Sequence, residues 1–100
     1  MLKLVTTIKP IHPGEVLSRD FMEPVGVSAN RLANHIGVSI NRIETVINGQ
    51  SSITSDTAIR LSRAFDTTPN FWVNLQSHFD IECAKDKAEI NFGSIVQDID

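Results

Sequence analysis

The sequence predicts an all-α fold, a bundle of five helices with extended or flexible N- and C-terminal segments. Apolar residues recur at helical spacing in five stretches between residues 12 and 80. Short segments containing Gly, Pro or Asn separate these stretches, and a Ser, Thr or Pro stands at the start of each one. Weak strand-like alternation is confined to the chain ends, so we expect helices packed on helices.

The first helix is predicted to begin at Pro13, because proline suits a first helical turn, where its missing N–H has no partner to lose. Glu15 lies in the same turn, where the helix dipole favours a negative charge. The apolar stripe of this helix consists of Val16, Leu17 and Phe21. Pro24 and Gly26 are expected to end it. Residues 1–11 are expected to form an extended N-terminal arm or an edge strand.

The second and third helices are predicted on either side of a short turn. Ser28 is a suitable N-cap for the second helix, which is expected to end at Gly37. Its apolar positions are Leu32, Ala33 and Ile36. Ser39 can cap the third helix, which is expected to stop at Asn48 and Gly49. Its apolar positions are Ile43, Val46 and Ile47.

The fourth helix is predicted to be capped by Thr54 or Ser55, with Asp56 in its first turn. Its inward positions are Ala58, Leu61, Ala64 and Phe65. Pro69 starts the fifth helix, whose aromatic and aliphatic residues repeat at helical spacing and therefore favour core packing over a ligand pocket. From residue 81 to residue 100 the apolar pattern thins, and it leaves open whether this C-terminal tail is partly ordered or mobile.

Length and composition suit a single domain of 100 residues, 41% of them apolar. Cys83 is the only cysteine, so it cannot form an intramolecular disulfide, and a reducing compartment is expected. The N-terminus lacks the apolar core of a secretory signal, and no stretch approaches the roughly 20 apolar residues of a membrane span. We therefore expect a cytoplasmic protein without membrane contact.

The formal net charge of −3 hides an asymmetry. Residues 1–49 contain five basic and four acidic residues, a net charge of +1. Residues 50–100 contain four basic and eight acidic residues, a net charge of −4. Contact with a polyanion such as DNA is therefore expected to involve the first half of the chain.

The predicted third helix turns a varied polar face outward, with Asn41 and Thr45 opposite its apolar arc, flanked by Ile40, Arg42 and Glu44. An Asn can bond bidentately to an adenine edge, Thr or Ile can touch a thymine methyl group, and Arg can reach a guanine or a phosphate. A short turn containing Gly before such a helix lets it enter a major groove about 12 Å wide. Ordinary helical hairpins share this turn, so the spacing alone leaves both interpretations open.

A resemblance to known proteins favours the first interpretation. The helix-turn-helix of the phage-repressor-like family resembles residues 28–50, SANRLANHIGVSINRIETVINGQ. The HigA branch of that family resembles both flanks, HPGEVLSRDFMEPVGVS at 12–28 and ITSDTAIRLSRAFDTTPNFWVNLQSHFD at 53–80. The resemblance thus covers a predicted DNA-binding domain of residues 12–80, with the helix-turn-helix at 28–49.

HigA proteins are antitoxins of toxin-antitoxin modules. The resemblance therefore implies a homodimer that binds a palindromic operator in its own promoter, represses transcription and neutralises a partner toxin that cleaves mRNA at the ribosome. It implies base-reading roles for Ser39, Ile40, Asn41, Arg42 and Thr45. It implies phosphate contacts by Ser28, Asn30, Arg31 and Asn48.

Three positions depart from the family pattern. Ala29 stands where many relatives have a phosphate-binding Gln, and Gln50 where Lys is common, so nonspecific DNA binding is expected to be weak. Asp66 stands where Gly is usual, which is tolerable because Asp can adopt a left-handed backbone conformation.

Other functions lack a supporting pattern. His12, His35 and His78 show no metal-ligand spacing, and His12 is better explained as an aid to the start of the first helix. Asp20 and Glu23 have no catalytic companions, so we expect neither an enzyme nor a cofactor. The alternative function is a protein-binding module, or a transcription regulator without a toxin partner.

Overall fold

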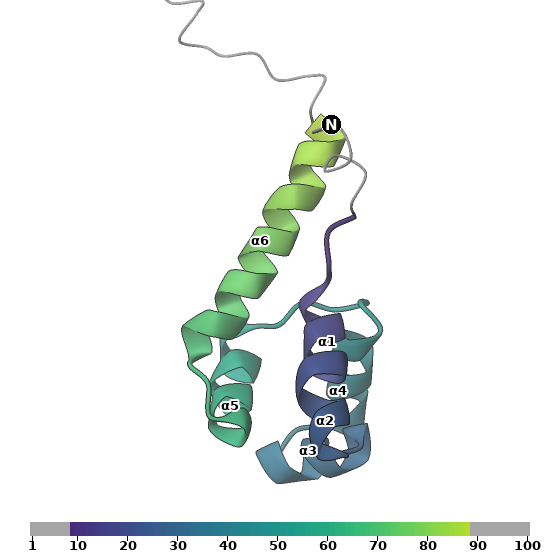
Figure 1. Ribbon diagram of the computed structural model, residues 1–100, viewed down its shortest axis with the longest axis vertical. Helices are drawn as coiled ribbons and strands as arrows, with labels where there is room; N and C mark the ends of the chain where they lie inside the picture. Colours follow the sequence, from purple (N-terminus) through teal and green to yellow (C-terminus); the bar gives the residue numbers. More distant parts are fainter. Residues whose placement is uncertain (1–8, 89–100) are drawn as a thin grey trace, which may run out of the picture.

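The computed structural model describes residues 9–88, which form five helical segments and no strand (Figure 1). The first segment is continuous from Pro13 to Val25 and comprises α1 (Pro13–Val16), the π-helical stretch η2 (Leu17–Met22) and α2 (Glu23–Val25). The others are α3 (Ala29–Ile36), α4 (Ile40–Ile47), α5 (Ser55–Phe65) and α6 (Pro69–Ala88). The all-α prediction is confirmed. Most of the predicted N-terminal arm or edge strand lies outside the described residues.

The first helical segment starts at Pro13 and ends at Gly26, as predicted, but it continues through Pro24, which was also expected to end it. The Nδ1 atom of His12 accepts a hydrogen bond from the N–H of Gly14 at 2.8 Å, so His12 caps α1. In η2 the N–H of Glu23 bonds to the carbonyl of Ser18, five residues back. In an α-helix a proline ring clashes with the carbonyl group four residues before it. The wider turn of η2 displaces the carbonyl groups from their α-helical positions and so avoids this clash at Pro24. The helix therefore passes Pro24 and ends at Gly26, in the left-handed conformation at φ 71°.

Short polar side chains fix the ends of the next helices. The Oγ atom of Ser28 accepts a bond from the Arg31 N–H at 3.1 Å and caps α3. Ser39 caps α4 in the same way, and Thr54, not Ser55, caps α5. Asp66 adopts the left-handed conformation at φ 56° and ends α5, as its substitution for Gly led us to expect.

The core lies where η2, α3, α4, α5 and α6 meet. Trp72 of α6 is fully buried, as are Leu17, Ile43 and Leu61 from the other segments. The indole N–H of Trp72 donates to the Thr67 hydroxyl at 2.8 Å, so its polar atom is satisfied inside the core. This burial confirms the predicted core packing for Trp72, whereas Phe71, expected on the same side of the helix, is 37% exposed.

Helix α6 rises away from the body of the domain, and the segment before α1 runs beside it (Figure 1). Lys9, Pro10 and Ile11 of that segment form an open groove with Leu75, His78 and Glu82 of α6. The helix continues to Ala88, so the first eight residues of the predicted tail are helical, while residues 89–100 lie outside the described residues. Among residues 9–88, no helix is long and apolar enough to cross a membrane.

Candidate nucleic-acid interface

Helices α3 and α4 are joined by a tight turn that exposes one face of α4. Gly37 ends α3 in the left-handed conformation at φ 77°, and the N–H groups of Gly37 and Val38 both bond to the Ala33 carbonyl. Ile43 and Val46 of α4 are buried. Ile40 is 41% exposed, and Asn41, Arg42 and Glu44 are exposed as well. The face of α4 predicted to meet DNA therefore points to solvent.

Two hydroxyl groups on this helix are already engaged within the protein. The Ser39 oxygen accepts the Arg42 N–H at 3.1 Å, which leaves its own O–H free to donate. The Thr45 hydroxyl donates to the Arg42 carbonyl at 3.2 Å and lies 2.9 Å from the Ser51 hydroxyl. These bonds use most of the hydrogen-bonding capacity of Thr45. The Thr45 methyl group is left for apolar contact.

Arg42 is bound to a residue outside the predicted site. Its Nη1 atom lies 2.7 Å from Oδ2 of Asp56, in the first turn of α5. The same oxygen accepts a bond from Nε of Arg60 at 3.0 Å. Arg60 in turn donates to the Ile36 carbonyl at the end of α3, at 2.7 Å. The sequence offered only the helical spacing of Asp56 and Arg60 as a signal, and nothing to link either residue to α4.

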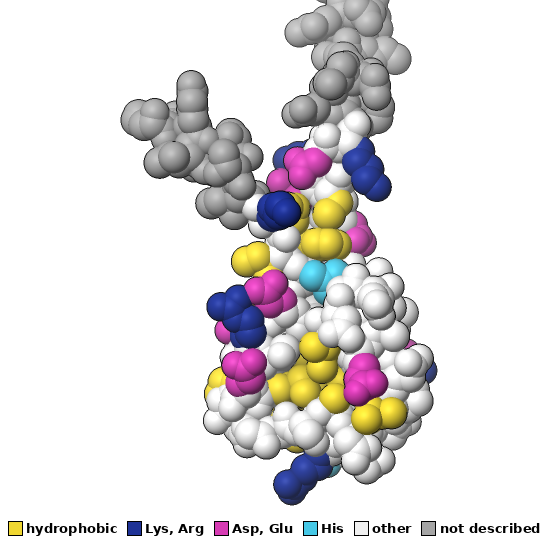
Figure 2. All heavy atoms as spheres, turned by 90° about the vertical axis from the view of Figure 1, so that its right-hand side faces the viewer, with side chains coloured by type: hydrophobic (Ala, Val, Ile, Leu, Met, Phe, Trp, Pro, Cys, Tyr) yellow, Lys and Arg dark blue, Asp and Glu magenta, His cyan; other side chains and the backbone are white. Residues whose placement is uncertain are grey.

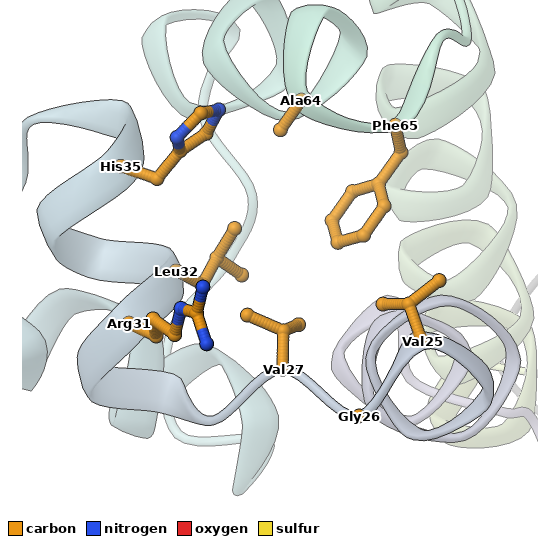
Figure 3. Close-up of a pocket in the computed structure, with 8 residues that line it drawn as sticks. All are labelled: Val25, Gly26, Val27, Arg31, Leu32, His35, Ala64 and Phe65. Carbon is orange, nitrogen blue, oxygen red and sulfur yellow. The ribbon is translucent and has the colours of Figure 1, made fainter.

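The four predicted phosphate contacts do not form one cluster. Ser28 and Asn30 lie at the start of α3, whereas Asn48 follows the far end of α4. Arg31 and His35 project from α3 into an open pocket of about 290 Å³ (Figure 3). The other lining residues are Val25, Gly26, Val27, Leu32, Ala64 and Phe65. The backbone N–H of Arg31 lies at the start of α3, where it bonds to Ser28, but the Arg31 side chain points away into this pocket.

The face shown in Figure 2 carries scattered basic side chains interspersed with acidic ones. Charges of opposite sign also pair on single helices: exposed Arg19 bonds to Glu15 on the first helical segment. A chain with a net charge of −3 and this distribution gains little general attraction to the DNA backbone. Such a charge distribution favours contacts to the edges of bases over contacts to phosphates.

The start of α1 and the loop after α4 meet α6 at a contact that we call the His12 joint, formed by His12, Ser51 and Phe79. The imidazole packs edge-on against the Phe79 ring, with centroids 4.9 Å apart. Burial lowers the pKa of His12 from its ordinary value near 6.5, while a backbone hydrogen bond at Ser51 and the charge of Asp80 act in the opposite direction. Neutral imidazole is the form that can accept the Gly14 N–H.

Two further contacts hold α4 and the loop that follows it. Gly14 of α1 approaches the α4 backbone so closely that an added Cβ would lie 1.8 Å from the Val46 carbonyl oxygen. Gln76 of α6 is buried, and its Oε1 accepts the Ile53 N–H at 2.8 Å. Nothing in the sequence marks Gly14 as a point of contact between two helices. Helical periodicity does not reveal such a close approach of two backbones.

Comparison with known proteins agrees with this geometry. The helix-turn-helix family model matches residues 19–72. A HigA-family addiction module antidote protein from Coxiella burnetii is 43% identical, with a TM-score of 0.79 over 87% of this chain and 99% of that one. The Pseudomonas aeruginosa antitoxin HigA, solved with the higBA promoter, is 38% identical, with a TM-score of 0.79 over 81% of this chain and 88% of that one.

Antitoxin HigA-1 of Vibrio cholerae is 38% identical over 76 residues, which span 76% of this chain and 71% of the relative. The resemblance seen in the sequence is therefore confirmed, both in the matched segment and in the arrangement of the helices. The chain belongs to the phage-repressor-like helix-turn-helix family of non-enzymatic DNA-binding proteins, in its HigA branch.

Proposed function

We propose that this protein is an antitoxin that binds operator DNA as a homodimer, represses its own promoter and neutralises a partner toxin that cleaves mRNA. The main support is the outward face of α4. At the start of this helix an apolar, an amide and a cationic side chain are exposed next to one another, namely Ile40, Asn41 and Arg42. A related antitoxin, the Pseudomonas aeruginosa HigA, was solved with promoter DNA. Such a protein acts in the cytoplasm, where its operator is.

Helix α4 reads the bases in this proposal. Asn41 bonds to an adenine edge, Ile40 and Thr45 contact thymine methyl groups, and Ser39 and Arg42 complete the set. The DNA phosphates are contacted at the two ends of the helix-turn-helix by Ser28, Asn30, Arg31 and Asn48. The tight turn at Gly37 and the packing of Gly14 against α4 support a fixed orientation of the reading face.

The homodimer follows from the limits of one domain. One α4 helix spans only a few base pairs, and the net charge of −3 adds no general attraction to phosphates. Two copies related by two-fold symmetry double the base contacts. Their recognition helices would lie about 34 Å apart and read an inverted repeat with half-sites about one helical turn apart.

The decisive experiment replaces Asn41 with Ala and measures binding to the DNA upstream of the reading frame and to every single-base variant of the footprinted site. We expect Asn41→Ala to relax selection at one base pair per half-site by about 1–3 kcal/mol. Arg31→Ala should weaken binding to all sequences alike and flatten the dependence on salt. Asn34→Ala on α3, also an exposed Asn, is the matched control and should change neither property.

If Asn41→Ala left both affinity and base preference unchanged, its base-reading role would be wrong. A second candidate function, a protein-binding module that only sequesters a toxin, is favoured by Ala29, Gln50 and the acidic second half of the chain. A gel-shift assay at low salt separates the two. If no shift appeared with or without the toxin, only sequestration would remain. A shifted band that disappears when unlabelled upstream DNA is added supports the repressor.

A further inference from the structure

Arg42 is the only basic residue in α4. Asp56 of α5 is positioned to fix the orientation of its guanidinium group. The Arg42 Nη1 atom donates to Asp56 Oδ2 at 2.7 Å. Within residues 9–88, the Nε and Nη2 atoms of Arg42 make no hydrogen bond. A guanidinium held by one nitrogen still presents this other edge, with two parallel donors.

Asp56 is itself held in place by Arg60. Arg60 bonds through Nε to Asp56 at 3.0 Å and through Nη1 to the Ile36 carbonyl at 2.7 Å. The same Nη1 atom lies 3.3 Å from the Cβ position of Gly37, in the turn between α3 and α4. A continuous chain of hydrogen bonds thus links the end of α3, the first turn of α5 and the reading helix α4.

The charges of this chain suit contact with DNA. The bonds from Arg42 and then from Arg60 lower the pKa of Asp56, so its carboxylate is ionised at neutral pH. Two guanidinium groups surround this one carboxylate, so the cluster keeps a net positive charge next to the reading face. Phosphates are therefore not repelled by the cluster as a whole.

We propose that Asp56 is a positioning residue for base recognition: it keeps its bond to Arg42 in the complex and directs the free Nε and Nη2 edge of Arg42 toward N7 and O6 of a guanine. This inference rests on the proposed DNA-binding function. A fixed guanidinium loses less rotamer freedom when it binds, and it is kept away from phosphates that any sequence would offer. Both effects favour operator DNA over other DNA.

The test compares Asp56→Asn with wild type by fluorescence anisotropy, using the upstream DNA, its single-base variants and a scrambled duplex over a range of salt concentrations. The base pair read by Arg42 is the one whose preference is lost in Arg42→Ala. There, we expect Asp56→Asn to reduce the preference for guanine by about threefold to tenfold. Binding to scrambled DNA should become more salt-dependent, by about one unit of slope, because Arg42 is released to phosphates.

Asp66→Asn is the matched control, because it makes the same change of charge at the other end of α5. Asn, like Asp, tolerates the left-handed conformation that this position requires. Arg42→Lys is the second variant and should lose the guanine preference while keeping its affinity for scrambled DNA, because Lys lacks the forked donor pair. If Asp56→Asn matched Asp66→Asn in base preference and salt slope, the inference would be overturned. A wild type that did not distinguish upstream from scrambled DNA would refute the proposed function as well.

Discussion

Replacing Gly14 with Ala tests the packing of the first helix against the recognition helix. From helix propensity alone, Gly→Ala should stabilise a helix by up to about 1 kcal/mol. The structure predicts the opposite sign. The added Cβ would lie 1.8 Å from the Val46 carbonyl oxygen, 2.6 Å from the Val46 carbonyl carbon and 3.0 Å from the Ile47 Cα, whereas ordinary contact starts at 3.4 Å.

These three neighbours are backbone atoms, which cannot rotate away as a side chain would. Helices α1 and α4 must therefore separate, which loosens the packing around Leu17, Ile43 and Val46, all of them buried. Overpacking typically costs about 1–3 kcal/mol, and the fixed neighbours place Gly14→Ala at the upper end. After subtraction of the propensity gain, a net loss of about 2 kcal/mol lowers the melting temperature by about 8–16 °C.

Urea denaturation followed by circular dichroism measures this loss as a shift of the midpoint at constant slope. Gly26→Ala is the control, because an added Cβ there meets nothing within 4 Å and the only cost is the left-handed conformation at φ 71°, about 1 kcal/mol. A Gly14→Ala variant as stable as wild type, or more stable, would refute the close approach of the two helices. A loss no larger than that of Gly26→Ala would also contradict it.

Two further predictions concern contacts that hold the loop after the recognition helix. Because the pKa of His12 is lowered in the fold, the unfolded chain takes up the proton first, so stability is retained above about pH 6.5 and lost as the pH falls below it. His12→Asn, which still offers a capping oxygen, should flatten this loss in thermal melts between pH 7 and pH 5, roughly the range in which imidazole titrates, and an unchanged slope would contradict the assignment. Gln76→Leu should cost about 1–3 kcal/mol in denaturation experiments, because it leaves the buried Ile53 N–H without its partner. Asn74→Leu, exposed on the same helix, should cost little, and equal losses in the two variants would argue against a special role for Gln76.

The elements that local chemistry determines could be predicted from the sequence. Ser28 and Ser39 cap their helices, and Asp66 takes the left-handed conformation, because each of these roles depends on one residue and its immediate neighbours. The outward direction of Asn41 follows from the helical period in the same way. The assignment of α4 as a reading helix needed the resemblance in addition, since many hairpins share its spacing.

The features that the sequence did not reveal depend on segments far apart in the chain. The bond from Arg42 to Asp56 joins two helices, and no periodicity relates these residues. The extension past Pro24 requires a change to π-helical bonding, which the rule that proline ends a helix does not anticipate. The sequence also left open whether the chain beyond residue 80 is ordered, because the second half of α6 has few buried residues to mark it.

The His12 joint has a consequence for the order in which the chain folds. The contacts between α3 and α4 and between α5 and α6 join neighbours in sequence, which meet quickly. The joint connects residues near opposite ends of the described chain, and the closure of so long a loop costs more entropy. We therefore expect the helix-turn-helix to form first and the joint last. In partial unfolding the joint should open first, so that α6 separates from the start of α1 while α4 keeps its fold.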